Sequence, residues 1–156
     1  MTTCLQRIYV AAAPADLGVL AATRALPATV QATSADSPAA PAYAVTKALG
    51  TAYAGCDDEE LEYVAMCDAV DASRAIVGPR GHRVVIAADI AATRLGEPTD
   101  YHGDAPPSLV VVTGPLELRD VVSFHIDEDI APDEDELSWY DVTELGVVVE
   151  LLGNQG

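Results

Sequence analysis

The amino-acid sequence predicts a single α/β domain spanning residues 1–156, with a mixed β-sheet and two or three packed helices. Half of the residues are hydrophobic, and a chain of 156 residues is long enough to bury one sizeable core. Apolar runs of strand length alternate with helix-like segments in the first half of the chain, and they cluster in the second half. This order of elements is typical of an α/β domain.

The chain begins with a predicted strand and helix. The segment RIYVAAA at 7–13 is short and apolar and is bounded by Pro14, which indicates a buried strand. Pro14 suits the first turn of a helix, and Asp16 is favourable near the N-terminus of that helix. Pro27 lies beyond the expected helix end. A strand followed by a helix is therefore expected before Pro27.

Two segments rich in glycine or proline, at about 27–41 and 91–107, and an acidic run at about 128–137 are expected to be flexible loops. After the first loop we expect a short strand at 42–45. A helical turn should follow it from Thr46 and end near Gly55.

The acidic stretch DDEE at 57–60 is predicted to begin a long helix rather than to form a metal or acid–base site. With Asp57 as the N-cap, Glu60 occupies the third helical position, and acids in a first turn complement the helix dipole. The helix should end near Val77, because Gly78 and the proline after it favour termination.

This helix carries apolar residues on two sides, so we expect it to pack deeply in the domain. Glu62 lies between the two apolar arcs and is therefore a candidate functional carboxylate. One arc consists of Leu61, Ala65, Ala69, Ala72 and Ile76, and the other of Tyr63, Met66, Val70 and Val77.

The second half of the chain is predicted to be rich in strands, at 82–90, 108–114 and 120–127. The aromatic pair at 139–140 is expected to close the core. Asp141 and Glu144 repeat the N-cap spacing, which predicts a short helix from 142. The β-branched residues that follow make a strand at 145–152 the alternative.

The net charge of −17, from 25 acidic and 8 basic residues, limits the classes of partner. Such a surface repels nucleic-acid phosphates and anionic lipids, so we expect neither nucleic-acid nor membrane binding. A basic protein partner is compatible with this charge. Three cysteines, an odd number without metal-ligand spacing, indicate a reducing compartment, and no stretch is apolar enough to span a membrane. We therefore expect a cytoplasmic protein.

Six segments occur in the order RIYVAAA, AYAVTKAL, DDEELEYVAMCDAVDAS, RVVIAADI, VVSFHID and WYDVTEL. Together they resemble a family of small acidic actinobacterial proteins with no assigned function. The resemblance touches about half of the chain. It implies a bacterial, cytoplasmic setting, and it brings no activity and no catalytic residue.

The candidate catalytic residues are few. His125 and Asp127 lie two residues apart and so on the same side of a predicted strand, where they could act as a general base or as a ligand pair. A structural histidine at a strand end is the alternative interpretation. Glu62 is the third candidate. No metal-binding histidine spacing, nucleophile elbow or glycine-rich phosphate loop is present, so we expect no cofactor and no metal.

Three functions remain open from the sequence. The missing catalytic motifs and the single sign of the charge favour a non-catalytic interaction or regulatory module with an acidic surface. The first alternative is a small enzyme that depends on carboxylates and His125. The second is a domain that binds a small ligand or a cation.

Overall fold

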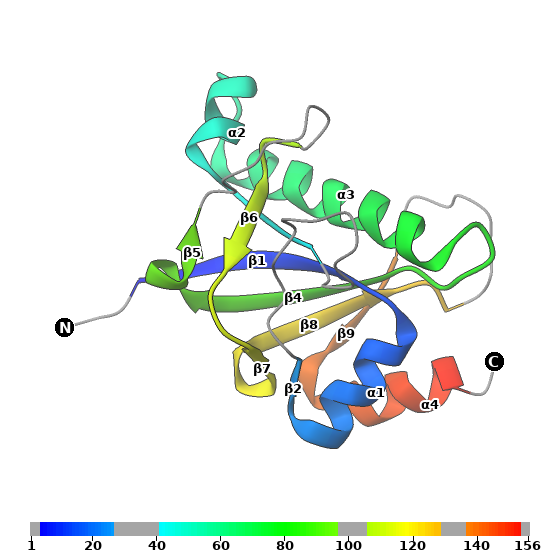
Figure 1. Ribbon diagram of the computed structural model, residues 1–156. Helices are drawn as coiled ribbons and strands as arrows, with labels where there is room; N and C mark the ends of the chain where they lie inside the picture. Colours follow the sequence, from blue (N-terminus) through cyan, green and yellow to red (C-terminus); the bar gives the residue numbers. More distant parts are fainter. Residues whose placement is uncertain (1–3, 27–40, 97–105, 129–136, 154–156) are drawn as a thin grey trace.

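A computed structural model describes residues 4–26, 41–96, 106–128 and 137–153, and its centre is a seven-stranded sheet (Figure 1). The strands are arranged in the order β5-β6-β3-β1-β4-β8-β9. Their bounds are β1 (Leu5–Ala12), β3 (Ala42–Ala44), β4 (Val84–Ala91), β5 (Leu95–Gly96), β6 (Leu109–Val112), β8 (Val121–Ile126) and β9 (Ser138–Asp141). A separate two-stranded ladder pairs β2 (Ala25–Leu26) with β7 (Leu116–Glu117).

The α/β class is confirmed, but the sheet differs from the mixed sheet that the sequence suggested, because every described strand pairing is antiparallel. The reason lies in the crossover between β3 and β4. Both strands pair antiparallel with β1, so they run in the same direction, but β1 lies between them. A helical crossover therefore joins parallel strands that are not neighbours.

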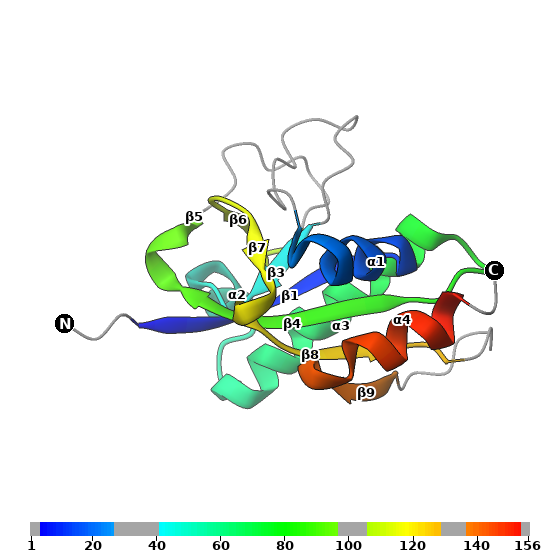
Figure 2. The same ribbon diagram turned by 90° about the horizontal axis from the view of Figure 1, so that it is seen from below.

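Helices cover both faces of the sheet and make three layers (Figures 1 and 2). Helices α1 (Pro14–Thr23) and α4 (Leu145–Gly153) pack against each other on one face. Helices α2 (Lys47–Ala52) and α3 (Asp58–Val77) lie on the other, where α3 packs on β1, β3 and β4. Two hydrophobic cores result, one on each side of the sheet.

Strand β1 shows how the sequence divides between the two cores. Ile8 and Val10 face the core beneath α1 and α4, whereas Tyr9 and Ala11 face the core beneath α3. Alternate residues of a strand point to opposite faces of a sheet. A continuous apolar run is therefore the pattern expected of a strand that is covered on both faces.

Both ends of α3 and the start of α4 agree with the sequence predictions. The side chain of Asp57 caps α3 by accepting the Glu60 backbone N–H at 2.9 Å, and Gly78, with φ of 79°, ends the helix. Asp141 accepts the Thr143 N–H at 3.0 Å in a short 3₁₀ turn that leads into α4. Residues 145–152 are therefore helical, and the strand alternative is wrong.

Two packing predictions are wrong. Helix α3 is not buried on two sides, since Tyr63 is 68% exposed and Ile76 is 48% exposed. The sheet covers one side of α3, and no described element packs over the opposite side. The aromatic pair does not close the core together either, because Trp139 is 59% exposed while Tyr140 packs against the core beneath α4.

The three predicted loops lie largely outside the described residues. Within the second one, Ala92–Arg94 form a 3₁₀ turn and β5 follows, so this part of the loop belongs to the sheet. A third 3₁₀ turn, Leu118–Asp120, precedes β8. Among the described helices, none is both long and apolar enough to cross a membrane.

Candidate functional site

The structure places the three candidate residues on the α3 side of the sheet but does not join them. His125 lies in β8, Asp127 follows the end of that strand, and Glu62 lies in the first half of α3. Asp127 is paired with arginines at one end of β8, and His125 is closest to Ser123. The expected His125–Asp127 pair is therefore not formed, because Asp127 has stronger partners.

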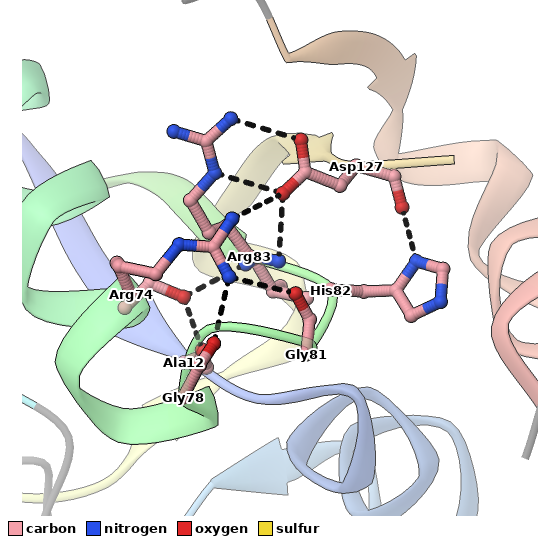
Figure 3. Close-up of polar contacts among 9 residues, drawn as sticks. Ala12, Arg74, Gly78, Gly81, His82, Arg83 and Asp127 are labelled. Atoms are coloured by element: carbon pink, nitrogen blue, oxygen red, sulfur yellow. Dashed lines mark hydrogen bonds and ion pairs between the residues drawn. The ribbon is translucent and has the colours of Figure 1, made fainter. Parts of the chain in front are cut away.

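Asp127 is the centre of a buried polar cluster (Figure 3). The guanidinium of Arg83 donates to both carboxylate oxygens at 2.8 and 3.0 Å, and the Arg83 backbone N–H donates to one of them at 3.0 Å. Arg74 of α3 adds an ion pair at 3.6 Å. Asp127 and Arg83 are each 7% exposed. Charge-assisted bidentate pairs of this kind are strong, and here both carboxylate oxygens have donors.

The same cluster ties the end of α3 to three strands. Arg74 also donates to the Gly78 and Gly81 carbonyls at 2.7 and 3.0 Å. The buried hydroxyl of Ser73 donates to the Ala12 carbonyl at 2.7 Å and accepts the Val84 N–H at 2.8 Å. Because these hydrogen bonds and ion pairs hold α3 to the neighbouring strands, the cluster stabilises the fold.

His82 completes the cluster from its other side. Its Nδ1 lies 2.6 Å from the Asp127 carbonyl oxygen, and since a carbonyl can only accept, Nδ1 carries the proton. Nε2 is buried and has no hydrogen-bond partner in the described part of the chain.

The surroundings of His125, two residues before Asp127, are different in character. The Ser123 hydroxyl lies 3.3 Å from His125 Nε2, and burial, with a smaller effect from the Arg7 guanidinium, lowers the pKa of His125. The imidazole is therefore neutral at neutral pH and can accept or donate a proton. Ser123 is only 3% exposed, which keeps its hydroxyl away from a substrate in solution.

Arg7 and Asp89 form a cross-strand ion pair beside His125. The Arg7 guanidinium donates to the two Asp89 oxygens at 2.6 and 3.2 Å. Glu62 interacts electrostatically with this group. Burial is the main cause of the raised pKa of Tyr9, and the negative charge of Glu62 raises it further. The same charge also helps to raise the pKa of Arg7. Glu62 therefore belongs to the Arg7–Asp89 group, whereas Asp127 has its own arginines.

A groove runs between α3 and the segment that enters β9. We call it the α3–β9 groove. It encloses about 150 Å³ and combines apolar walls with an arginine and an acid. Its lining residues are Tyr63, Met66, Cys67, Val70, Asp71, Arg83 and Leu137.

Trp139 follows two residues after Leu137, which lines this groove. It lies directly opposite His125 in the β8–β9 ladder, so both side chains are on the α3 side of the sheet. Trp139 is exposed there, and among the described residues α3 packs mainly on β1, β3 and β4.

The acids at the start of α3 do not form a metal site in the described structure. Asp57 is used as the helix cap, and no group of three or more potential ligands occurs among the described residues. A shallow hollow beside them is lined by Cys56, Asp57, Glu59, Glu60, Tyr63 and Val64.

Sequence reasoning missed the arginines that pair with Asp127. Arg83 follows His82 at the start of an apolar strand, and a charged residue in such a run is a signal of a buried ion pair. Arg74 lies in the last turn of α3. Its partner lies 53 positions away along the chain, since Asp127 follows β8, and no local pattern connects the two.

The chain belongs to DUF6912, a family of unknown function, whose model matches residues 6–134. The matched range includes α3, β4 and β8 and ends before Leu137 and Trp139. No curated protein and no solved structure matches the chain.

Proposed function

We propose that this protein is a non-catalytic binding module of the bacterial cytoplasm that recognises a basic protein partner through the α3–β9 groove. The observation that carries this proposal is the exposure of two aromatic side chains: Tyr63, which lines the groove, is 68% exposed, and Trp139, two residues after the groove-lining Leu137, is 59% exposed. Exposed aromatic residues next to an apolar hollow are characteristic of protein-binding surfaces.

The charge around the groove determines the kind of partner. Asp71 lines the groove itself, and Glu59 lies in the neighbouring hollow that shares Tyr63 with it. The chain as a whole carries a net charge of −17. An acidic rim attracts a basic partner and raises its association rate, whereas acidic partners are repelled.

The cluster around Asp127 supports this role by making the groove rigid. Arg83 forms part of the groove lining and is held by Asp127, while Arg74 fixes the end of α3 to the same carboxylate. A preorganised surface loses less conformational entropy when it binds.

The test measures association rates of the tagged full chain with the partner recovered from the native host, at increasing salt concentration. We expect the association rate to fall steeply with salt, because the Debye length is only about 10 Å at 0.1 M. Charge reversal by Glu59→Lys or by Asp71→Lys, each tested as a single variant, should slow association several-fold. Glu150→Lys, an equal charge change at an exposed position of α4, is the matched control and should have a much smaller effect.

Asp68 is a poor choice for this test although it lies on the same helix. Its carboxylate accepts the Ser108 hydroxyl at 2.6 Å and is half-buried, so reversing its charge would disturb the fold. Equal effects of the groove variants and of Glu150→Lys would show that the acids act only through net charge, and would contradict a localised binding surface.

A His-dependent enzyme is the second candidate, favoured by the lowered pKa of His125 beside Ser123 and the Arg7–Asp89 pair. This function requires turnover of a small molecule by the purified protein. Turnover should then be lost in a His125→Ala variant whose free energy of unfolding is close to that of the wild type. Retained turnover in that variant would remove His125 from the catalytic machinery.

A further inference from the structure

We propose that the basic partner binds as an extended segment that adds a strand to the open edge of β9. This inference rests on the proposed function and specifies how the partner is held. Strand β9 is the last strand of the seven-stranded sheet, and among the described residues it pairs with β8 alone. An edge strand of this kind offers backbone donors and acceptors to an added strand.

The hydrogen-bond pattern shows which backbone groups of β9 face the open edge. The Asp141 N–H donates to the Glu144 carboxylate at 3.0 Å, so it does not point to β8. In an antiparallel ladder, alternate residues direct both backbone groups to the same side. Trp139, two positions before Asp141, therefore also directs its N–H and C=O away from β8.

Strand β8 gives the same answer independently. The Asp127 N–H donates to the Arg83 carbonyl at 3.1 Å, so this residue directs its N–H toward β4. His125, two residues earlier, does the same, and it lies opposite Trp139. The His125–Trp139 pair is therefore a non-hydrogen-bonded pair, and both backbone groups of Trp139 face the open edge.

The two edges of the sheet differ in how they are protected. Strand β5, at the opposite edge, has only two residues and ends in a glycine. Strand β9 has four residues, SWYD, with no lysine or proline, and its register with β8 is regular. Short length, lysine, proline and bulges are the usual means of blocking an edge. Of these, β9 has its modest length; in addition the Asp141 N–H is already bonded to the Glu144 carboxylate, so the backbone groups of Trp139 are the ones offered to an added strand.

The side chains next to this edge favour cationic residues in the added strand. On the α3 side, the exposed indole of Trp139 offers a cation–π surface, and Asp141 follows it on the same side. On the other side, the Tyr140 hydroxyl donates to the Glu128 carboxylate, which places a second acid near the edge. Lysine or arginine at alternate positions of a partner segment would meet these groups.

A second copy of this chain is a poorer occupant of the same edge. Pairing of two β9 strands would place Asp141 and Glu144 of both copies along one shared edge. Each copy also carries a net charge of −17. Like net charges repel and disfavour such an association.

The probe for the test is a short synthetic peptide in which lysine alternates with valine. On titration of the full-length protein, the Trp139 amide should become protected from hydrogen exchange, whereas the Ser138 and Tyr140 amides are already protected by β8. The matched control peptide carries N-methyl groups at alternate residues, which removes the docking N–H groups and keeps the side chains. We expect it to bind at least about tenfold more weakly, the loss of about two net hydrogen bonds.

Two protein variants separate the backbone of Trp139 from its indole. Trp139→Ala removes the ring, and Trp139→Pro removes the ring and the edge N–H without touching a β8 hydrogen bond. Strand addition predicts a further loss of affinity in the proline variant of about threefold to tenfold. The N-methylated peptide keeps the test decisive if the proline variant folds poorly.

Three outcomes would overturn the inference. Equal binding of both peptides without protection of the Trp139 amide would overturn strand addition and leave a groove-binding function in place. If the Trp139 amide becomes protected from hydrogen exchange as the protein concentration rises, without any peptide, the strand that pairs with β9 comes from a second copy of the protein. Absence of peptide binding would also overturn it, and the salt-dependent association with the native partner tests the proposed function separately.

Discussion

Asp127 and His125 lie two residues apart on the same side of one strand, yet their surroundings are opposite. Asp127 is closed in by Arg83 and Arg74, and both of its carboxylate oxygens have donors. His125 faces the open part of the sheet, opposite the exposed Trp139. The difference shows that α3 divides this face of the sheet into two parts. The C-terminal end of the helix is fixed to Asp127 through Arg74, whereas among the described residues the helix packs mainly on β1, β3 and β4 and not over β9.

The largest effect is expected when the closed end is broken. Asp127→Ala leaves the charge of Arg83 buried without its main partner, so the variant should lose about 3–5 kcal/mol of unfolding free energy in denaturant titrations. Asp89→Ala, which breaks the half-exposed pair with Arg7, should lose less than about 1 kcal/mol. Similar losses of unfolding free energy in the two variants would show that the Asp127 cluster is no more closed to water than the Arg7–Asp89 pair.

A smaller effect is expected for Ser73, the second link between α3 and the strands. Ser73→Ala leaves the buried Val84 N–H and the Ala12 carbonyl without this partner and should cost about 1–3 kcal/mol. The loss should appear in urea unfolding with an unchanged dependence on urea concentration. A neutral substitution would show that Arg74 alone fixes this end of the helix.

The N-terminus of α3 should be still less sensitive. Asp57→Ala removes the helix cap and should cost about 1 kcal/mol, measured by thermal or denaturant unfolding. Partner binding should survive, with at most a small loss of association rate from the removed charge, because Asp57 lines the neighbouring hollow and not the α3–β9 groove. Loss of binding in a variant of nearly normal stability would instead make the acidic helix start a functional site.

The smallest effect concerns pH and sharpens the description of the open end. The unfolded chain titrates His125 near its ordinary pKa of 6.5, whereas burial and Arg7 lower the pKa of His125 in the folded protein. The unfolded state therefore binds the proton more readily, and stability present above about pH 6.5 is lost as the pH falls through the folded pKa.

The measurement is the unfolding free energy between about pH 7.5 and pH 5 for the wild type and for His125→Gln. The variant should lose less stability on acidification than the wild type. If the two plots of unfolding free energy against pH run parallel, His125 is as solvated in the folded protein as in the unfolded chain. The partial burial of this residue would then be wrong.

Most elements followed from local patterns in the sequence. The cap at Asp57, the glycine at the end of α3 and the capping residues before α4 act within a few positions, so their spacing was visible in the chain. Apolar runs indicated β1, β4 and β8 because these strands are largely buried. Short strands such as β5 carry too few residues for a pattern.

The layout of the candidate site could not be predicted in the same way. The sequence placed His125 and Asp127 on one side of a strand, which is correct, but it could not show that Arg83 and Arg74 would take Asp127. It also placed Trp139 in the core, because an aromatic residue beside Tyr140 is equally compatible with either face of a strand.

The sequence by itself determined the α/β class, the acidic character and the helix boundaries, because composition and near-neighbour hydrogen bonds set these properties. Only the tertiary structure decided the antiparallel order of the sheet, the partners of Asp127 and the exposure of Tyr63 and Trp139. The physical reason is the same in each case. These properties depend on which distant segments lie side by side, and among the described residues α3 packs mainly on β1, β3 and β4 rather than on β8 and β9.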